Sequence, residues 1–189
     1  MSLFSGFETD VKNIQVFPQW RVLLYIIVGY GLCQIIFYFS TDFFKSIVIY
    51  AGLGLTFSIA ISTMLSETRL RIVLFLSLST LLYFLMLQLS LVQAYFSPNP
   101  FFVILASVSG AILETLLFCT LFQCLGYLTY LDIIFVLLFA ALAFFVLTAV
   151  HLPGSSDFVG IVIWQLAVGY AFTRIYTRKI ATQKPAEHP

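Results

Sequence analysis

The fourth of the apolar runs in this chain covers residues 101–127 and reads FFVILASVSGAILETLLFCTLFQCLGY. Apart from Gln123, its uncharged side chains are aromatic, aliphatic or small, and Glu114 is its one charged residue. A helix needs about 20 mostly apolar residues to cross a hydrocarbon core of about 30 Å. The run therefore predicts a transmembrane helix that carries an ionisable group about midway along its length.

Five more runs of similar composition accompany it, separated by short segments of turn-forming residues. The six predicted spans cover residues 22–41, 46–65, 71–96, 101–127, 132–152 and 158–176. We expect an all-α, polytopic membrane helical bundle of about six transmembrane helices. It divides into an N-terminal segment (1–21), the six-span domain (22–176) and a basic, polar C-terminal tail (177–189).

The composition excludes several classes of protein. The chain is 61% hydrophobic and 9% charged, with a mean hydropathy of +1.06, whereas soluble domains are roughly 45–50% apolar and about 25% charged. Disordered chains are poor in aromatic residues and rich in charge. Nine Lys and Arg against eight Asp and Glu provide no basic surface for nucleic acid. The expected partners are membrane lipids and other integral membrane proteins.

The N-terminal segment and the basic residues predict how the chain meets the membrane. Residues 5–17 are expected to form a short amphipathic helix at the interface, with a capping box at Ser5 and Glu8 and an end at Pro18. With six spans both termini share a side, and eight of the nine Lys and Arg residues fall on that side, leaving only Lys45 opposite. Because basic residues mark the cytoplasmic side, both termini are predicted to lie on the cytoplasmic side, or on the equivalent side of an organelle membrane.

Two residues are candidates for chemistry. Glu114 would be costly to bury as an ion, so it is expected to be protonated, paired or in contact with a water-filled cavity. His151, at the end of the fifth predicted span, could act as a metal ligand, a pigment ligand, a proton acceptor or an interfacial polar residue. The three cysteines show no paired spacing, and they are expected to pack as small apolar side chains.

Residues 111–125 resemble the first motif of the CPBP intramembrane proteases (the CAAX protease and bacteriocin-processing family), which reads EExxxR. The segments around Phe158-Val159-Gly160 and Gln165 to Arg174 are also similar to that family. The resemblance covers residues 101–180. It implies that Glu114 matches the first glutamate, which activates a water. It also implies that His151 matches the histidine of the FxxxH motif and helps to hold a metal, zinc.

The chain departs from the family pattern at three positions, where Thr115, Cys119 and Leu147 replace a glutamate, an arginine and a phenylalanine. A protein-bound metal needs about three ligands, and Glu114 with His151 supplies two, so no firm metal site is predicted. These departures favour a pseudoenzyme: a non-catalytic accessory or scaffold subunit of a membrane complex that packs against other proteins, lipid or pigment.

Three alternatives remain open at this point. A CPBP-type metalloprotease would use Glu114 and His151, with zinc as its cofactor. A rhomboid-type serine protease would use the segment Ser107-Val108-Ser109-Gly110 with His151 as its base. The third alternative is a small transporter.

Overall fold

The computed structural model describes residues 19–39, 41, 51–96, 100–149 and 156–183. Within these ranges the chain is helical and contains no strand, which confirms the predicted all-α class for the described part. The predicted helix at 5–17 lies outside the described residues. The elements are α1 (Gln19–Phe39), α3 (Leu53–Ser62), α4 (Arg69–Phe96), α5 (Pro100–Leu121), the 3-10 turn η2 (Leu125–Tyr127), α6 (Tyr130–Ala149) and α7 (Ser156–Gln183).

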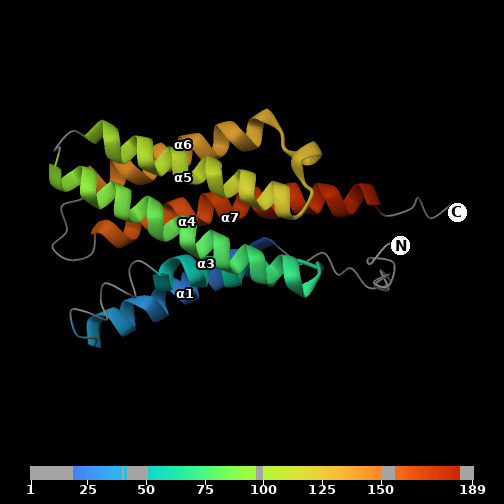
Figure 1. The fold of residues 1–189 in the computed structure, drawn as a ribbon, viewed down its shortest axis with the longest axis horizontal. Helices are drawn as coiled ribbons and strands as arrows, with labels where there is room; N and C mark the ends of the chain where they lie inside the picture. The colour runs from blue at the N-terminus through green and yellow to red at the C-terminus, as the bar shows by residue number, and fades with distance from the viewer. Residues whose placement is uncertain (1–18, 40, 42–50, 97–99, 150–155, 184–189) are drawn as a thin grey trace, which may run out of the picture.

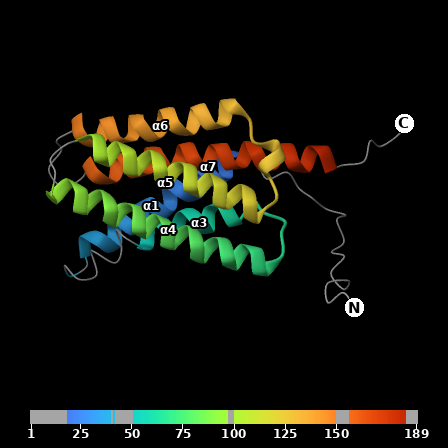
Figure 2. The ribbon, with the colours of Figure 1, turned by 45° about the horizontal axis from the view of Figure 1, so that its top comes forward.

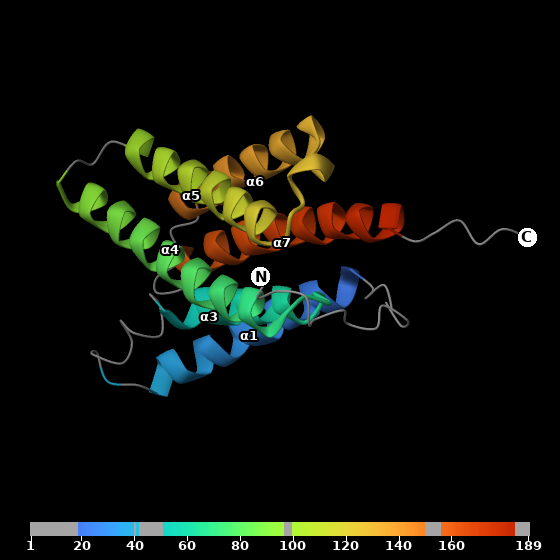
Figure 3. The same cartoon turned by 45° about the vertical axis from the view of Figure 1, so that its right-hand side comes forward.

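The helices form one bundle along a common long axis (Figure 1). α7 occupies its middle and packs against α1, α3, α5 and α6. α1 and α6 lie at opposite edges of the bundle in Figures 1 and 3, whereas in the view of Figure 2 α4 forms the edge opposite α6. The start of α1, the turns between α3 and α4 and between α5 and α6, and the end of α7 all lie at one end of the bundle. We call this the polar end, because its turns carry most of the charged side chains described below.

Aromatic rings fill the centre of the bundle. Phe118 on α5 stacks on Phe172 of α7 with a centroid distance of 4.2 Å and an angle of 10° between the ring planes. Phe75 on α4 meets Phe118 and Phe122 edge-on. All four rings are completely buried. Such contacts join α4, α5 and α7 through apolar area and ring geometry together.

Within the described residues, three helices are long and apolar enough to cross a membrane: Trp20–Phe39, Arg69–Met86 and Ile104–Leu121. The shorter apolar stretches in the described part are Leu53–Ser62 and Tyr130–Ala143. Large apolar side chains cover the outside of the bundle, including Ile35 at 58% and Leu138 at 62% exposure. The fold is therefore compatible with a membrane protein. The three helices correspond to three of the six predicted spans, so the six-span bundle stays a prediction.

Two helix ends differ from the sequence-based boundaries. The fourth run was expected to continue to residue 127, but α5 ends at Leu121. Gln123 adopts a left-handed conformation with φ of 53°, and the Cys124 amide donates to the Cys119 carbonyl at 2.7 Å. This arrangement is a Schellman C-cap that uses no glycine at the left-handed position. At the other boundary, α7 continues past residue 176 to Gln183.

Candidate functional site

Glu114 lies inside the bundle, on the side of α5 that faces α4. Its side chain is 2% exposed, and its Oε1 atom is hydrogen-bonded to the Oγ atom of Ser79 on α4. Ser79 is 1% exposed. The carboxyl group that the sequence placed midway along a span is therefore enclosed by protein, and its described partner is a neutral hydroxyl group.

The hydrogen bonding continues from Ser79 to α3. The Oγ atoms of Ser58 and Ser79 are 2.7 Å apart, and Ser58 Oγ lies 2.8 Å from the carbonyl oxygen of Gly54 one turn earlier. Gly54 lets α3 pack closely against α4, because a Cβ atom at this position would lie 3.0 Å from the side chain of Tyr83 on α4. Ser58, Ser79 and Glu114 thus form a buried polar chain across three helices, which we call the Ser–Ser–Glu chain.

The two motif positions that follow Glu114 have local roles. Thr115 is buried, and its hydroxyl group donates to the Ala111 carbonyl at 2.7 Å. Cys119 is buried in the aromatic core. Neither side chain provides the second carboxylate or the cation that the CPBP motif has at these positions.

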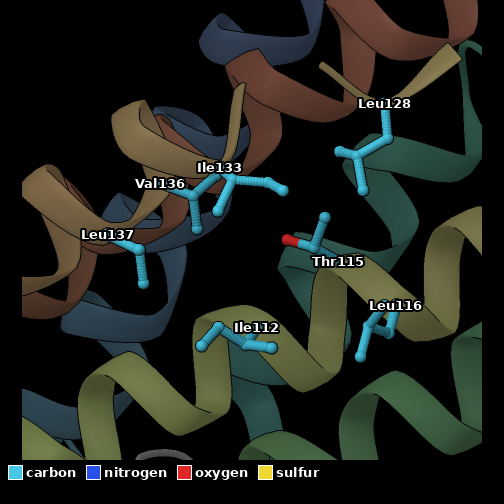
Figure 4. Close-up of a pocket in the computed structure, with 7 residues that line it drawn as sticks. All are labelled: Ile112, Thr115, Leu116, Leu128, Ile133, Val136 and Leu137. Carbon is cyan, nitrogen blue, oxygen red and sulfur yellow. The ribbon is translucent and has the colours of Figure 1, made fainter. Parts of the chain in front are cut away.

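An apolar hollow of ≈ 120 Å³ lies between α5 and α6 (Figure 4). It is lined by Ile112, Thr115, Leu116, Leu128, Ile133, Val136 and Leu137. Glu114 is not among the lining residues, because it points toward α4 instead. The one lining hydroxyl, that of Thr115, donates to its own helix. The hollow therefore brings no reactive polar group to Glu114.

His151 lies outside the described residues, so whether it meets Glu114 stays a prediction. Ser107, from the segment similar to rhomboid proteases, has structural contacts. Its hydroxyl group donates to the Ala140 carbonyl of α6 at 3.2 Å, and its own carbonyl accepts a hydrogen bond from Trp164 Nε1 of α7 at 3.2 Å. In this arrangement Ser107 links α5 to α6 and to α7.

The described residues contain no group of three or more His, Cys, Asp or Glu side chains placed to hold a metal ion. Cys33, Cys119 and Cys124 are free and buried. Burial raises the pKa of the Cys124 thiol, which follows the end of α5, to about 11. The thiolate is the form that binds metals, so burial disfavours the metal-binding form of Cys124.

A second polar cluster, at the polar end, was not foreseen from the sequence. Lys179 of α7 is 7% exposed. Its Nζ atom donates to Glu67 Oε1 at 2.6 Å and to the carbonyl of Phe122 at 2.7 Å. Glu67 also pairs with Arg71 at 2.9 Å. One buried ammonium group therefore joins the turn before α4, the end of α5 and the last turns of α7.

A separate ion pair joins α6 to α7 at the same end. Asp132 is 1% exposed and pairs with Arg178. Thr129 and Asp132 also form a reciprocal capping box. The Thr129 amide donates to Asp132 Oδ2 at 3.0 Å, and the Asp132 amide approaches Thr129 Oγ1 at 3.4 Å. The spacing of threonine and aspartate before an apolar run was the one sequence signal of this site.

No family model matches this chain, and neither a curated protein nor a solved structure matches it. The resemblance to CPBP proteases therefore rests on the motif residues themselves.

Proposed function

We propose that this protein is a multi-pass membrane protein that acts without catalysis, as a scaffold or accessory subunit. Its apolar exterior packs against other membrane proteins and lipid. In this proposal Glu114 is a hydrogen-bonding group between helices. The supporting observation is the enclosure of its carboxyl group, which is 2% exposed and bonded to Ser79. A general base must instead reach the proton that it abstracts, directly or through one water.

The exterior of the bundle supports the same role. α1 exposes large apolar side chains on several of its faces, among them Ile27, Ile35 and Phe39 at 49%, 58% and 82%. Exposed apolar area on this scale needs lipid or a partner helix to cover it. Charged side chains, in contrast, pair with one another at the polar end.

We also propose that the polar end faces the cytoplasm. Every Lys and Arg in the described part of the chain lies in the first turn of α1 or α4 or in the second half of α7. These segments lie toward the same end of the bundle (Figure 1). Basic residues accumulate on the cytoplasmic side of membrane proteins, which supports this orientation.

The test is extraction of the full-length protein from its native membrane in a mild detergent, followed by mass spectrometry and metal analysis of the same peak. We expect a stoichiometric complex without zinc, and we expect the E114Q variant to keep the same partners. The proposal fails if the protein is isolated alone with about one zinc ion per chain. It also fails if E114Q accumulates normally but stops the cleavage of a membrane protein.

A further inference from the structure

The Ser–Ser–Glu chain contains three consecutive oxygen-to-oxygen contacts. The first joins the Gly54 carbonyl oxygen to Ser58 Oγ at 2.8 Å, and the second joins Ser58 Oγ to Ser79 Oγ at 2.7 Å. The third joins Ser79 Oγ to Glu114 Oε1. Each full, two-centre hydrogen bond between two oxygen atoms requires one proton of its own, so three such bonds require three protons.

The two serines cannot supply three protons. A serine hydroxyl group has a single O–H donor, while a carbonyl oxygen has none. An ionised carboxylate is likewise only an acceptor. If Glu114 were ionised, Ser79 would donate to it and Ser58 would donate to Ser79. The single Ser58 proton would then have to be shared between Ser79 and the Gly54 carbonyl, in a three-centre bond that gives each contact less than a full hydrogen bond.

We propose that Glu114 is a proton-binding site, and that its carboxyl group donates this proton to Ser79. Ser79 then donates to Ser58, and Ser58 donates to the Gly54 carbonyl. The direction is set by that carbonyl, which can only accept. All three contacts become full hydrogen bonds when the proton is bound, and α3, α4 and α5 are joined through one continuous chain.

The surroundings of Glu114 support the neutral form. α3 has no ionisable side chain. The ionisable groups described on α4 are Arg69, Arg71 and Tyr83, and α5 adds Cys119. Among the described residues no ion pair involves Glu114, whereas Arg71 is paired with Glu67. A carboxylate in an apolar interior without a cation is strongly disfavoured, so a bound proton removes that cost.

This inference rests on the structural role proposed for Glu114 and adds its chemical state. A carboxyl group that donates its proton within the bundle cannot also be the base that activates a water. The protonated state of Glu114 and the non-catalytic role of the protein can nevertheless be disproved independently of each other. A missing proton overturns the inference and leaves the complex intact, whereas a lone zinc protein that cleaves its substrate overturns the function.

Infrared spectroscopy of the full-length protein in lipid nanodiscs at neutral pH tests the inference. A protonated carboxyl group has a C=O stretching band separate from the amide and carboxylate bands. We expect such a band in the wild type and its loss in E114Q. In S79A the band should remain but shift, because the carboxyl group loses its acceptor. Ser77 is exposed on the same helix, so S77A is the matched control and should leave the band in place.

Isotope labelling keeps the test valid if the variants fail to fold. The chain has four glutamates, at positions 8, 67, 114 and 187. Carbon-13 at their side-chain carboxyl groups should move the acid band of the unaltered protein. Glu67 cannot account for that band, because it is paired with Lys179 and Arg71. The inference is overturned if the wild type has no glutamate acid band at neutral pH, or if S79A leaves the band unmoved.

Discussion

Lys179 provides the sharpest test of how the bundle is held together at the polar end. The K179M variant keeps most of the length and apolar area of the side chain and removes its charge. Glu67, whose side chain is 10% exposed, would then retain only its pairing with Arg71. The Phe122 carbonyl at the end of α5 would lose the ammonium group that now donates to it at 2.7 Å.

The expected loss follows from these contacts. Removing one partner of a buried ion pair costs about 3 kcal/mol or more, because the other charge stays buried without compensation. The remaining contact with Arg71 places the expected cost at the low end of that range. R71A is the matched control, because its side chain is 34% exposed and such pairs contribute about 0.5 kcal/mol. The double variant K179M/E67Q should recover part of the loss, because it removes the stranded charge as well.

The assay is reversible unfolding of the purified protein in mixed micelles with increasing denaturing detergent. The free energy of unfolding should fall by about 3 kcal/mol in K179M and by well under 1 kcal/mol in R71A. Equal losses in the two variants would refute the argument from burial. The single variant E67Q completes the comparison. A loss in K179M/E67Q that equals the sum of the losses in K179M and in E67Q would show that Lys179 and Glu67 act independently.

Two further predictions concern backbone positions and use the same unfolding assay. A Cβ atom at Gly29 would lie 2.9 Å from Thr56 on α3, so G29A should cost about 1–2 kcal/mol through overpacking. G31A is the control on the same helix, because no atom lies within 4 Å of the added Cβ. It should be neutral or stabilising by up to about 1 kcal/mol. A larger loss of stability in G31A than in G29A would contradict this reasoning. Gln123 has φ of 53°, so Q123G should stabilise by about 0.5–1 kcal/mol, whereas Q123A should not, because alanine meets the same strain there.

The helical class and the position of the buried carboxyl group followed directly from the sequence. Long apolar runs leave a chain few alternatives to helices, since a helix satisfies its own backbone hydrogen bonds. A single acid within such a run is conspicuous, and Glu114 is indeed buried at 2% exposure. Composition and periodicity are local properties, so one sequence is enough to read them.

The partners of these groups could not be predicted, because they come from distant parts of the chain. Glu67 and Lys179 are separated by 112 positions, and Ser79 and Glu114 by 35. A serine in an apolar helix gives no signal of whether it faces lipid, its own backbone or a buried acid. In the sequence, Lys179 is one of several basic residues that follow the sixth predicted span. In the structure, its ammonium group is the centre of a buried network.

The end of α5 was missed for a related reason. Most residues directly after Leu121 are apolar. The left-handed position that ends the helix is held by Gln123, and the nearest glycine, Gly126, lies three residues further on in η2. The helix ends because the Cys124 amide bonds back to the Cys119 carbonyl and because Lys179 donates to the Phe122 carbonyl. The second of these contacts exists only in the folded bundle, so tertiary structure sets this boundary.

The two polar clusters differ in a way that bears on function. At the polar end, the two described carboxylates are both matched by cations: Glu67 by Lys179 and Arg71, and Asp132 by Arg178. In the middle of the bundle, Glu114 is matched by the neutral hydroxyl of Ser79. Balanced charges suit an interface where ions are tolerated, and a neutral acid suits an apolar interior. Both arrangements direct polar groups toward one another, which leaves the exterior of the described bundle rich in large apolar side chains. That exterior is the surface through which, under the proposed scaffold role, the protein would contact lipid and partner helices.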